Sequence, residues 1–185
     1  MTKLNEKMDR LRYKIQDPDF LKGKGLSNEV NIRIFTYDPE DEMKVRYFVS
    51  QLRKDENLKC NLIYVNLFDV LMDICEEDDL TEDVIELEKE DGSEILLDEL
   101  KLSIDVEDYI DMIDYENHQP GDVLILTGVG EVFPFLRIHI LLEAMQSRFS
   151  DIVVVVMYPG KFDGVSLSLF NEFESNSYYR AFNVI

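Results

Sequence analysis

The sequence predicts an α/β fold: a single domain of three layers, with helices covering a mostly parallel sheet of about five strands. Two apolar, β-branched runs, within residues 122–130 and 151–160, each end at glycine or proline. Such runs are typical of strands that are buried on both faces of a parallel sheet. Runs of this kind alternate with helix-patterned segments, which favours parallel pairing through crossover connections.

The N-terminal third of the chain alternates helix and strand patterns. Apolar residues spaced three or four apart over residues 4–15 predict an amphipathic helix, and residues 30–37 predict the first strand. Residues 40–54 predict a helix whose first turn is acidic, as its dipole favours. Residues 60–66 predict the second strand, so the pattern indicates β–α–β units.

The C-terminal third is predicted to hold the remaining elements of the sheet. A strand over residues 122–127 precedes a helix over 134–149, whose first residue is a proline, as suits a first helical turn. The next strand lies within residues 151–160. A short helix over 165–173 and a last strand over 178–185 complete the predicted order.

One segment between the second and third strands carries almost all of the net charge of −20. From Asp69 to Glu116 there are 21 acidic residues and two basic ones, Lys89 and Lys101, so this acidic insert contributes −19. Its apolar spacing predicts helices. Phosphate binding needs clustered Lys and Arg, so we expect no direct binding to nucleic acid and none to anionic membranes.

The acidic insert has three interpretations that the sequence leaves open. A dense run of charge most often forms a solvated helical face. It also suits a docking surface for a basic partner, whose association the charge would steer. The third interpretation is a mimic of the phosphate array of DNA.

Cysteine use and hydropathy indicate a cytoplasmic protein. Cys60 and Cys75 form no CxxC pair, and we expect both to be reduced thiols. No stretch approaches the roughly 18 apolar residues that a membrane helix needs. The charged N-terminal residues lack the apolar block of a signal peptide.

The loop from Thr127 through Gly128 to Gly130 lies where a phosphate-binding loop would lie, between a strand and a helix. The pattern GxxxxGK[ST] is absent, and Phe133 stands where GxGxxG would require its third glycine. Glu131 would also repel a phosphate. A tight turn that requires glycine explains the loop better, and nucleotide binding by a degenerate phosphate loop remains the alternative.

Three charged residues near the predicted strand ends are also candidates. Asp38 precedes a proline, where an Asx-type turn explains it at least as well as a divalent ion. Arg137, expected one turn into its helix, would oppose the helix dipole, so a specific carboxylate or anion partner is expected. Asp163 is one candidate partner. We found no catalytic set, and no cofactor or metal site is predicted.

These motifs resemble a known family, the BrxB proteins of bacterial BREX phage-exclusion systems. The resemblance covers essentially the whole chain, and its C-terminal motifs are specific. It rests on residues 17–21, 28–29, 37–39, 127–137, 158–164, 166–170 and 178–182.

The resemblance implies an intracellular role in defence against phage, as a non-catalytic adaptor that binds other BREX proteins. In such systems the recognisable chemistry belongs to companion proteins: an adenine methyltransferase, a large ATPase and a PglZ protein that resembles alkaline phosphatases. The family has no assigned catalytic residues to carry over. Interface cores favour aromatic residues and Arg, and glycine loops shape the sheet edge. The predicted ligand or partner contacts are Asp38, Thr127, Gly128, Gly130, Phe133, Phe135, Arg137, Tyr158, Gly160, Phe162, Asp163 and Arg180.

Overall fold

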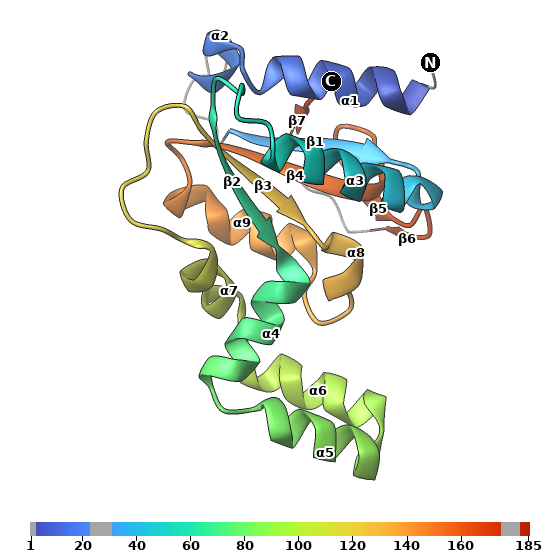
Figure 1. The fold of residues 1–185 in the computed structure, drawn as a ribbon. Coiled ribbons are helices and arrows are strands. Elements are labelled where there is room, and N and C mark those ends of the chain that lie inside the picture. The colour runs from blue at the N-terminus through green and yellow to red at the C-terminus, as the bar shows by residue number, and fades with distance from the viewer. Residues whose placement is uncertain (1–2, 23–30, 175–181) are drawn as a thin grey trace.

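A mostly parallel sheet forms the centre of the computed structural model, which describes residues 3–22, 31–174 and 182–185. Five parallel strands lie in the order β2-β3-β4-β1-β7 within that part of the chain (Figure 1). The predicted mostly parallel sheet of about five strands is therefore confirmed. Its strands are β1 (Ile32–Tyr37), β2 (Asn61–Asn66), β3 (Asp122–Thr127), β4 (Val153–Phe162) and β7 (Phe182–Asn183).

Helices cover both faces of this sheet, because its central strands are apolar on both sides. Val123 and Ile125 of β3 pack into one apolar cluster, and Leu124 and Leu126 pack into the other. The three predicted layers are present (Figure 1). The first face is covered by α1 (Lys3–Lys14) and α3 (Glu42–Arg53), and the second by α4 (Leu67–Glu77), α7 (Val106–Ile113), α8 (Val129–Val132) and α9 (Ile138–Arg148). Two short elements, α2 (Pro18–Leu21) and η1 (Pro39–Asp41), precede and follow β1.

The acidic insert is helical, as predicted, and connects β2 to β3. It begins with α4, whose first turn is capped by the Asn66 side chain through the N–H groups of Phe68 and Asp69. It ends with α7, which starts at a capping box formed by Asp105 and Asp108. Between them, α5 (Thr81–Asp91) and α6 (Ser93–Ser103) project from the body of the protein as a helical hairpin (Figure 1).

The predicted helix over residues 134–149 is wrong in its first four residues. Helix α8 ends at Val132, and α9 begins only at Ile138. Phe133 is extended, with φ −70° and ψ 133°, because the ring of a following proline disfavours helical backbone. Pro134 therefore lies in the connection between two helices, and Arg137 is the N-cap residue of α9 rather than an internal one.

The predicted short helix over residues 165–173 is also wrong, because this segment forms antiparallel strands. Strand β5 (Leu167–Leu169) pairs with the end of β4, and β6 (Phe173–Glu174) pairs with β5. Leu167 and Leu169 are buried on one side while Ser168 between them is not, which is the period of a strand. Of the predicted last strand, residues 178–181 lie outside the described ranges, and β7 forms part of the rest.

Candidate functional site

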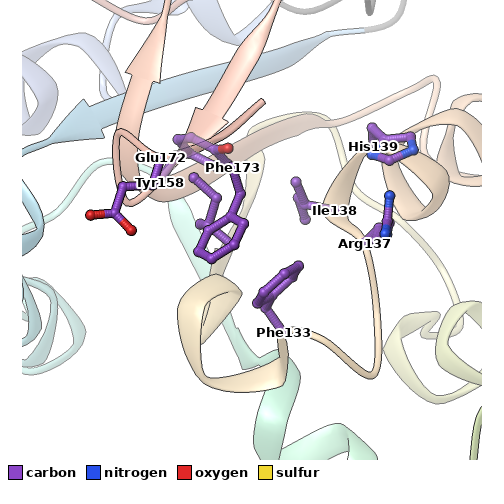
Figure 2. A pocket seen from close by; sticks show the side chains of 8 residues that line it. Phe133, Arg137, Ile138, His139, Tyr158, Glu172 and Phe173 are labelled. Carbon is purple, nitrogen blue, oxygen red and sulfur yellow. The ribbon is translucent and has the colours of Figure 1, made fainter. Parts of the chain in front are cut away.

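A pocket of about 290 Å³ opens beside the carboxyl end of β4 (Figure 2). Such edges are where α/β proteins usually place their sites. Two segments that are distant in sequence supply its lining. The connection from α8 into α9 contributes Phe133, Arg137, Ile138 and His139. The strands opposite contribute Tyr158, Leu169, Glu172 and Phe173.

Aromatic side chains form the apolar wall of the pocket. The rings of Phe133 and Phe173 lie 5.2 Å apart at a tilt of 40°, and Phe170 meets Phe173 edge-on at 6.4 Å. Half of the Phe173 side chain is exposed, although it belongs to this ring cluster. Tyr158 is buried behind the rings, and burial raises the pKa of its phenol. The wall is therefore uncharged, and one of its rings is open to solvent.

Arg137 and His139 make the opposite side of the pocket polar (Figure 2). Arg137 is exposed, and its guanidinium makes no ion pair or hydrogen bond with any other residue that the structure describes. His139 is half-buried. Burial lowers the pKa of its imidazole, and the positive charge of Arg137 lowers it further. A cation with no partner in residues 3–22, 31–174 and 182–185 is notable in a chain of net charge −20, because carboxylates are abundant.

The two glycines of the loop after β3 are required by close packing. Gly128 has φ +74°, and a Cβ atom on it would lie 2.2 Å from Oδ1 of Asn66. A Cβ atom on Gly130 would lie 2.7 Å from the ring of Phe170. Side chains thus occupy the space beside both glycines, and α8 has only four residues. This packing favours the tight-turn interpretation over a phosphate loop.

Thr127 and Glu131, on either side of these glycines, also serve local structure. Thr127 is buried, and its hydroxyl donates to the Tyr64 hydroxyl at 3.0 Å and lies 3.3 Å from the carbonyl oxygen of Val65. Glu131 pairs with Arg46 at 2.8 Å. These contacts join β3 and α8 to neighbouring elements.

Asp38 and Asp163 each hydrogen-bond within their own loop. Asp38 caps η1 by accepting from the N–H of Glu40, which is the Asx-type turn anticipated from its sequence. The carboxylate of Asp163 accepts from the N–H groups of Ser166 and Val165, which lower its pKa. Arg137 and Asp163 form no ion pair with each other, so that predicted pairing is wrong.

The other candidate residues lie at different depths. Phe135 is half-buried against the main apolar core, and Phe162 is buried opposite Leu167 in the antiparallel extension. Gly160 pairs with Leu169 in the same extension. Arg180 lies outside the described residues. The structure therefore brings three of the predicted contact residues together in one pocket: Phe133, Arg137 and Tyr158.

Sequence reasoning missed the pocket residues that depend on the hairpin of β5 and β6. Leu169, Glu172 and Phe173 all fall within residues 165–173, the segment that was predicted to be helical. The alternation of Leu167, Ser168 and Leu169 was the one available signal for a strand. No motif in the sequence marks His139 as a site residue, and its position beside Arg137 follows only from where α9 begins.

Neither cysteine of the chain is activated by its surroundings. Burial raises the pKa of both Cys60 and Cys75, which disfavours the reactive thiolate. Within residues 3–22, 31–174 and 182–185, no three His, Cys, Asp or Glu side chains are grouped to hold a metal ion. In the same ranges no helix is both long and apolar enough to cross a bilayer.

The fold and the site define a mostly parallel α/β protein with an aromatic pocket at its sheet edge and, beside it, a cation that has no partner within the described part of the chain. A profile of the family described as BREX protein BrxB matches residues 63–184. The chain belongs to the BrxB family of BREX proteins, which confirms the resemblance seen in its motifs. It is therefore a component of an antiviral BREX system.

Two relatives match over nearly their whole length. The BREX protein BrxB of Bacillus cereus (strain H3081.97) is 35% identical over 192 residues, which span 100% of this chain and 99% of that protein. The BREX protein BrxB of Escherichia coli O9:H4 (strain HS) is 30% identical over 187 residues, which span 98% of this chain and 92% of that protein. No solved structure matches the chain.

Proposed function

We propose that this protein is a non-catalytic adaptor of the BREX system, which acts in the cytoplasm and binds another BREX protein through the pocket beside β4. The observation that carries this proposal is the guanidinium of Arg137, exposed at the rim of an aromatic pocket with no partner among the described residues. Arg and aromatic side chains are enriched in the cores of protein interfaces.

The chemistry of the pocket fits a protein segment better than a reacting substrate. An apolar side chain of the partner would pack against Phe133 and Phe173, and a nearby carboxylate would pair with Arg137. In Figure 2 the Glu172 carboxylate lies beyond the rings, away from Arg137, so Glu172 does not neutralise the guanidinium. Candidate partners are the PglZ-type protein, the large ATPase and the methyltransferase.

Co-purification from cells that express the complete BREX system tests this proposal. Tagged wild-type chain is expected to retain at least one BREX protein. Arg137→Ala and Phe173→Ala are each expected to weaken that retention at least about tenfold, as central interface residues do.

Two control variants remove the same kinds of side chain, an Arg and an aromatic residue, from the opposite face of the sheet. Arg10→Ala removes an exposed charge from α1, and Tyr13→Ala removes an aromatic ring that is 77% exposed. Both are expected to retain the partner. If the two pocket variants hold every partner as firmly as wild type, the pocket is not the interface. If wild type retains no BREX protein, the adaptor role itself is wrong.

A further inference from the structure

A second surface, remote from the pocket beside β4, lies on the helical hairpin of the acidic insert. Helix α5 buries none of its 11 residues, and α6 buries only Leu96 and Leu100. The two helices lie side by side away from the sheet (Figure 1). A groove of about 350 Å³ runs between them. The hairpin therefore exposes apolar surface that the body of the protein does not cover.

The floor of this groove is apolar. Leu80, Val84 and Leu87 line it from the α5 side, spaced as one face of a helix requires. Leu96 and Leu100 line it from α6. The three residues on the α5 side are only partly buried, so a partner that covered them would remove further apolar surface from water.

The rim of the groove is acidic. Asp83, Glu86, Glu90 and Glu99 line it, and no Lys or Arg is among the described residues that do so. The surrounding insert contributes −19 of the net charge of −20. A partner must therefore carry positive charge around an apolar stripe. A second copy of this chain is disfavoured because two such inserts repel one another, and nucleic acid is disfavoured for the same reason.

We infer that the groove between α5 and α6 binds a basic amphipathic helix of a partner protein. An amphipathic helix laid in a groove of this kind is a recurring mode of recognition. The 11 residues of α5 span about 16 Å, so the partner segment needs about three helical turns. Apolar side chains of the segment pack on the floor while its Lys and Arg residues pair with the rim.

A synthetic peptide of about 15 residues, with leucines on one helical face and lysines on the other, serves as the probe. Fluorescence anisotropy with the full chain is expected to show saturable binding. Resonance shifts in NMR spectra are expected to map to α5 and α6. A peptide of the same composition in scrambled order, with no apolar face, is expected to bind at least about tenfold more weakly.

Two pairs of matched variants locate the binding. Leu87→Glu places a charge in the groove and is expected to weaken binding at least about tenfold, although it makes the insert more acidic. Ile85→Glu adds the same charge at a half-exposed residue outside the groove and is expected to have little effect. Far-UV circular dichroism checks that both variants keep their helices.

The second pair separates rim charge from total charge. One triple variant neutralises the rim of the groove: Glu86→Gln, Glu90→Gln and Glu99→Gln. The matched triple variant removes as much charge outside the groove: Glu82→Gln, Glu94→Gln and Asp98→Asn. The rim variant is expected to weaken peptide binding more than the matched variant does. Equal weakening by both triple variants, or equal binding of the scrambled peptide, would overturn the inference. Either result would mean that the peptide responds only to overall charge. The outcome does not depend on the pocket beside β4.

Discussion

Arg46 on α3 forms an ion pair with Glu131 on α8, with 2.8 Å between Nη2 and Oε1. These helices cover opposite faces of the sheet, so the pair spans its carboxyl edge. Arg46 also pairs with Glu42 on its own helix at 2.7 Å, and the Asn66 amide donates to Glu131 at 3.3 Å. Glu131, which would repel a phosphate from the glycine loop, thus has a structural role as the partner of Arg46.

Separating this ion pair is expected to have a modest effect on stability. A double-mutant cycle with Arg46→Met and Glu131→Gln should give a coupling of about 0.5–1 kcal/mol, because both side chains are partly exposed. Urea unfolding at low salt measures this coupling, and about 1 M salt should reduce it. A coupling of zero at low salt would show that the two charges do not interact in solution.

Gly128→Ala is expected to destabilise the protein by about 2–4 kcal/mol, because positive φ and crowding both penalise the new methyl group. Gly128 has φ +74°, and the added carbon would lie 2.2 Å from the Asn66 oxygen that also caps α4. Gly164→Ala is the matched control, since Gly164 has φ +97° but no atom within 4 Å of its Cβ position. The control should cost about 1 kcal/mol in chemical unfolding, and equal costs would argue against the contact with Asn66.

The strands and the insert could be predicted because their signals are local. Residues 122–127 are apolar on both faces, and the acidic insert repeats its apolar residues at helical spacing. The break before α9 was missed, because a proline suits a first helical turn as well as a connection. The hairpin of β5 and β6 was missed because β5 has three residues, too few for a clear period.

The candidate site could be predicted only in part, because contacts between distant segments leave no local pattern. The aromatic residue Phe133 and the cation Arg137 stand out in the sequence beside a glycine loop. Phe173 joins them only through the pairing of β5 with β4. In the same way, the Asn66 side chain that fills the space beside Gly128 comes from another strand end.

Asp122→Asn is expected to cost about 1–3 kcal/mol near neutral pH, because it disturbs a buried hydrogen-bond network at the start of β3. The Asp122 carboxylate accepts from Asn61 Nδ2 at 2.8 Å, from the Tyr115 hydroxyl at 2.8 Å and from the N–H of Gln119 at 2.9 Å. Burial raises the pKa of this carboxyl, but these bonds outweigh burial, so its pKa lies below the ordinary value.

The direction of this pKa shift determines how the contribution of Asp122 to stability depends on pH. A lowered pKa in the folded state means that the ionised carboxylate stabilises the fold above the unfolded pKa of about 3.9, and that this contribution is lost as pH falls through the folded value. The difference in unfolding free energy between wild type and Asp122→Asn should therefore shrink as pH drops from 7 to 3. Urea unfolding across that range measures it, and a difference that is independent of pH would contradict the assignment.

His139 is expected to titrate below the ordinary value of about 6.5 for histidine, because burial and then the charge of Arg137 disfavour its protonation. NMR titration measures this directly: the chain has two histidines, and His139→Gln assigns the resonances. Arg137→Ala should raise the pKa of His139 only part of the way, since burial is the larger cause. Arg10→Ala, which removes an equal charge from α1, should leave it unchanged.

The same titration reports whether the pocket receives a carboxylate. The pKa of His139 is lower in the folded chain than in the unfolded chain, where it is about 6.5. Between these two pKa values the unfolded chain binds more protons, so the stability of the fold should decline as pH falls through that range. A partner carboxylate that pairs with Arg137 would offset the neighbouring positive charge and raise the pKa of His139. Binding at the pocket should then take up protons near that pKa. Suppose that Arg137→Ala disrupts the complex, but that the pKa of His139 is the same in the complex as in the free chain. The partner would then contact Arg137 without an anionic group.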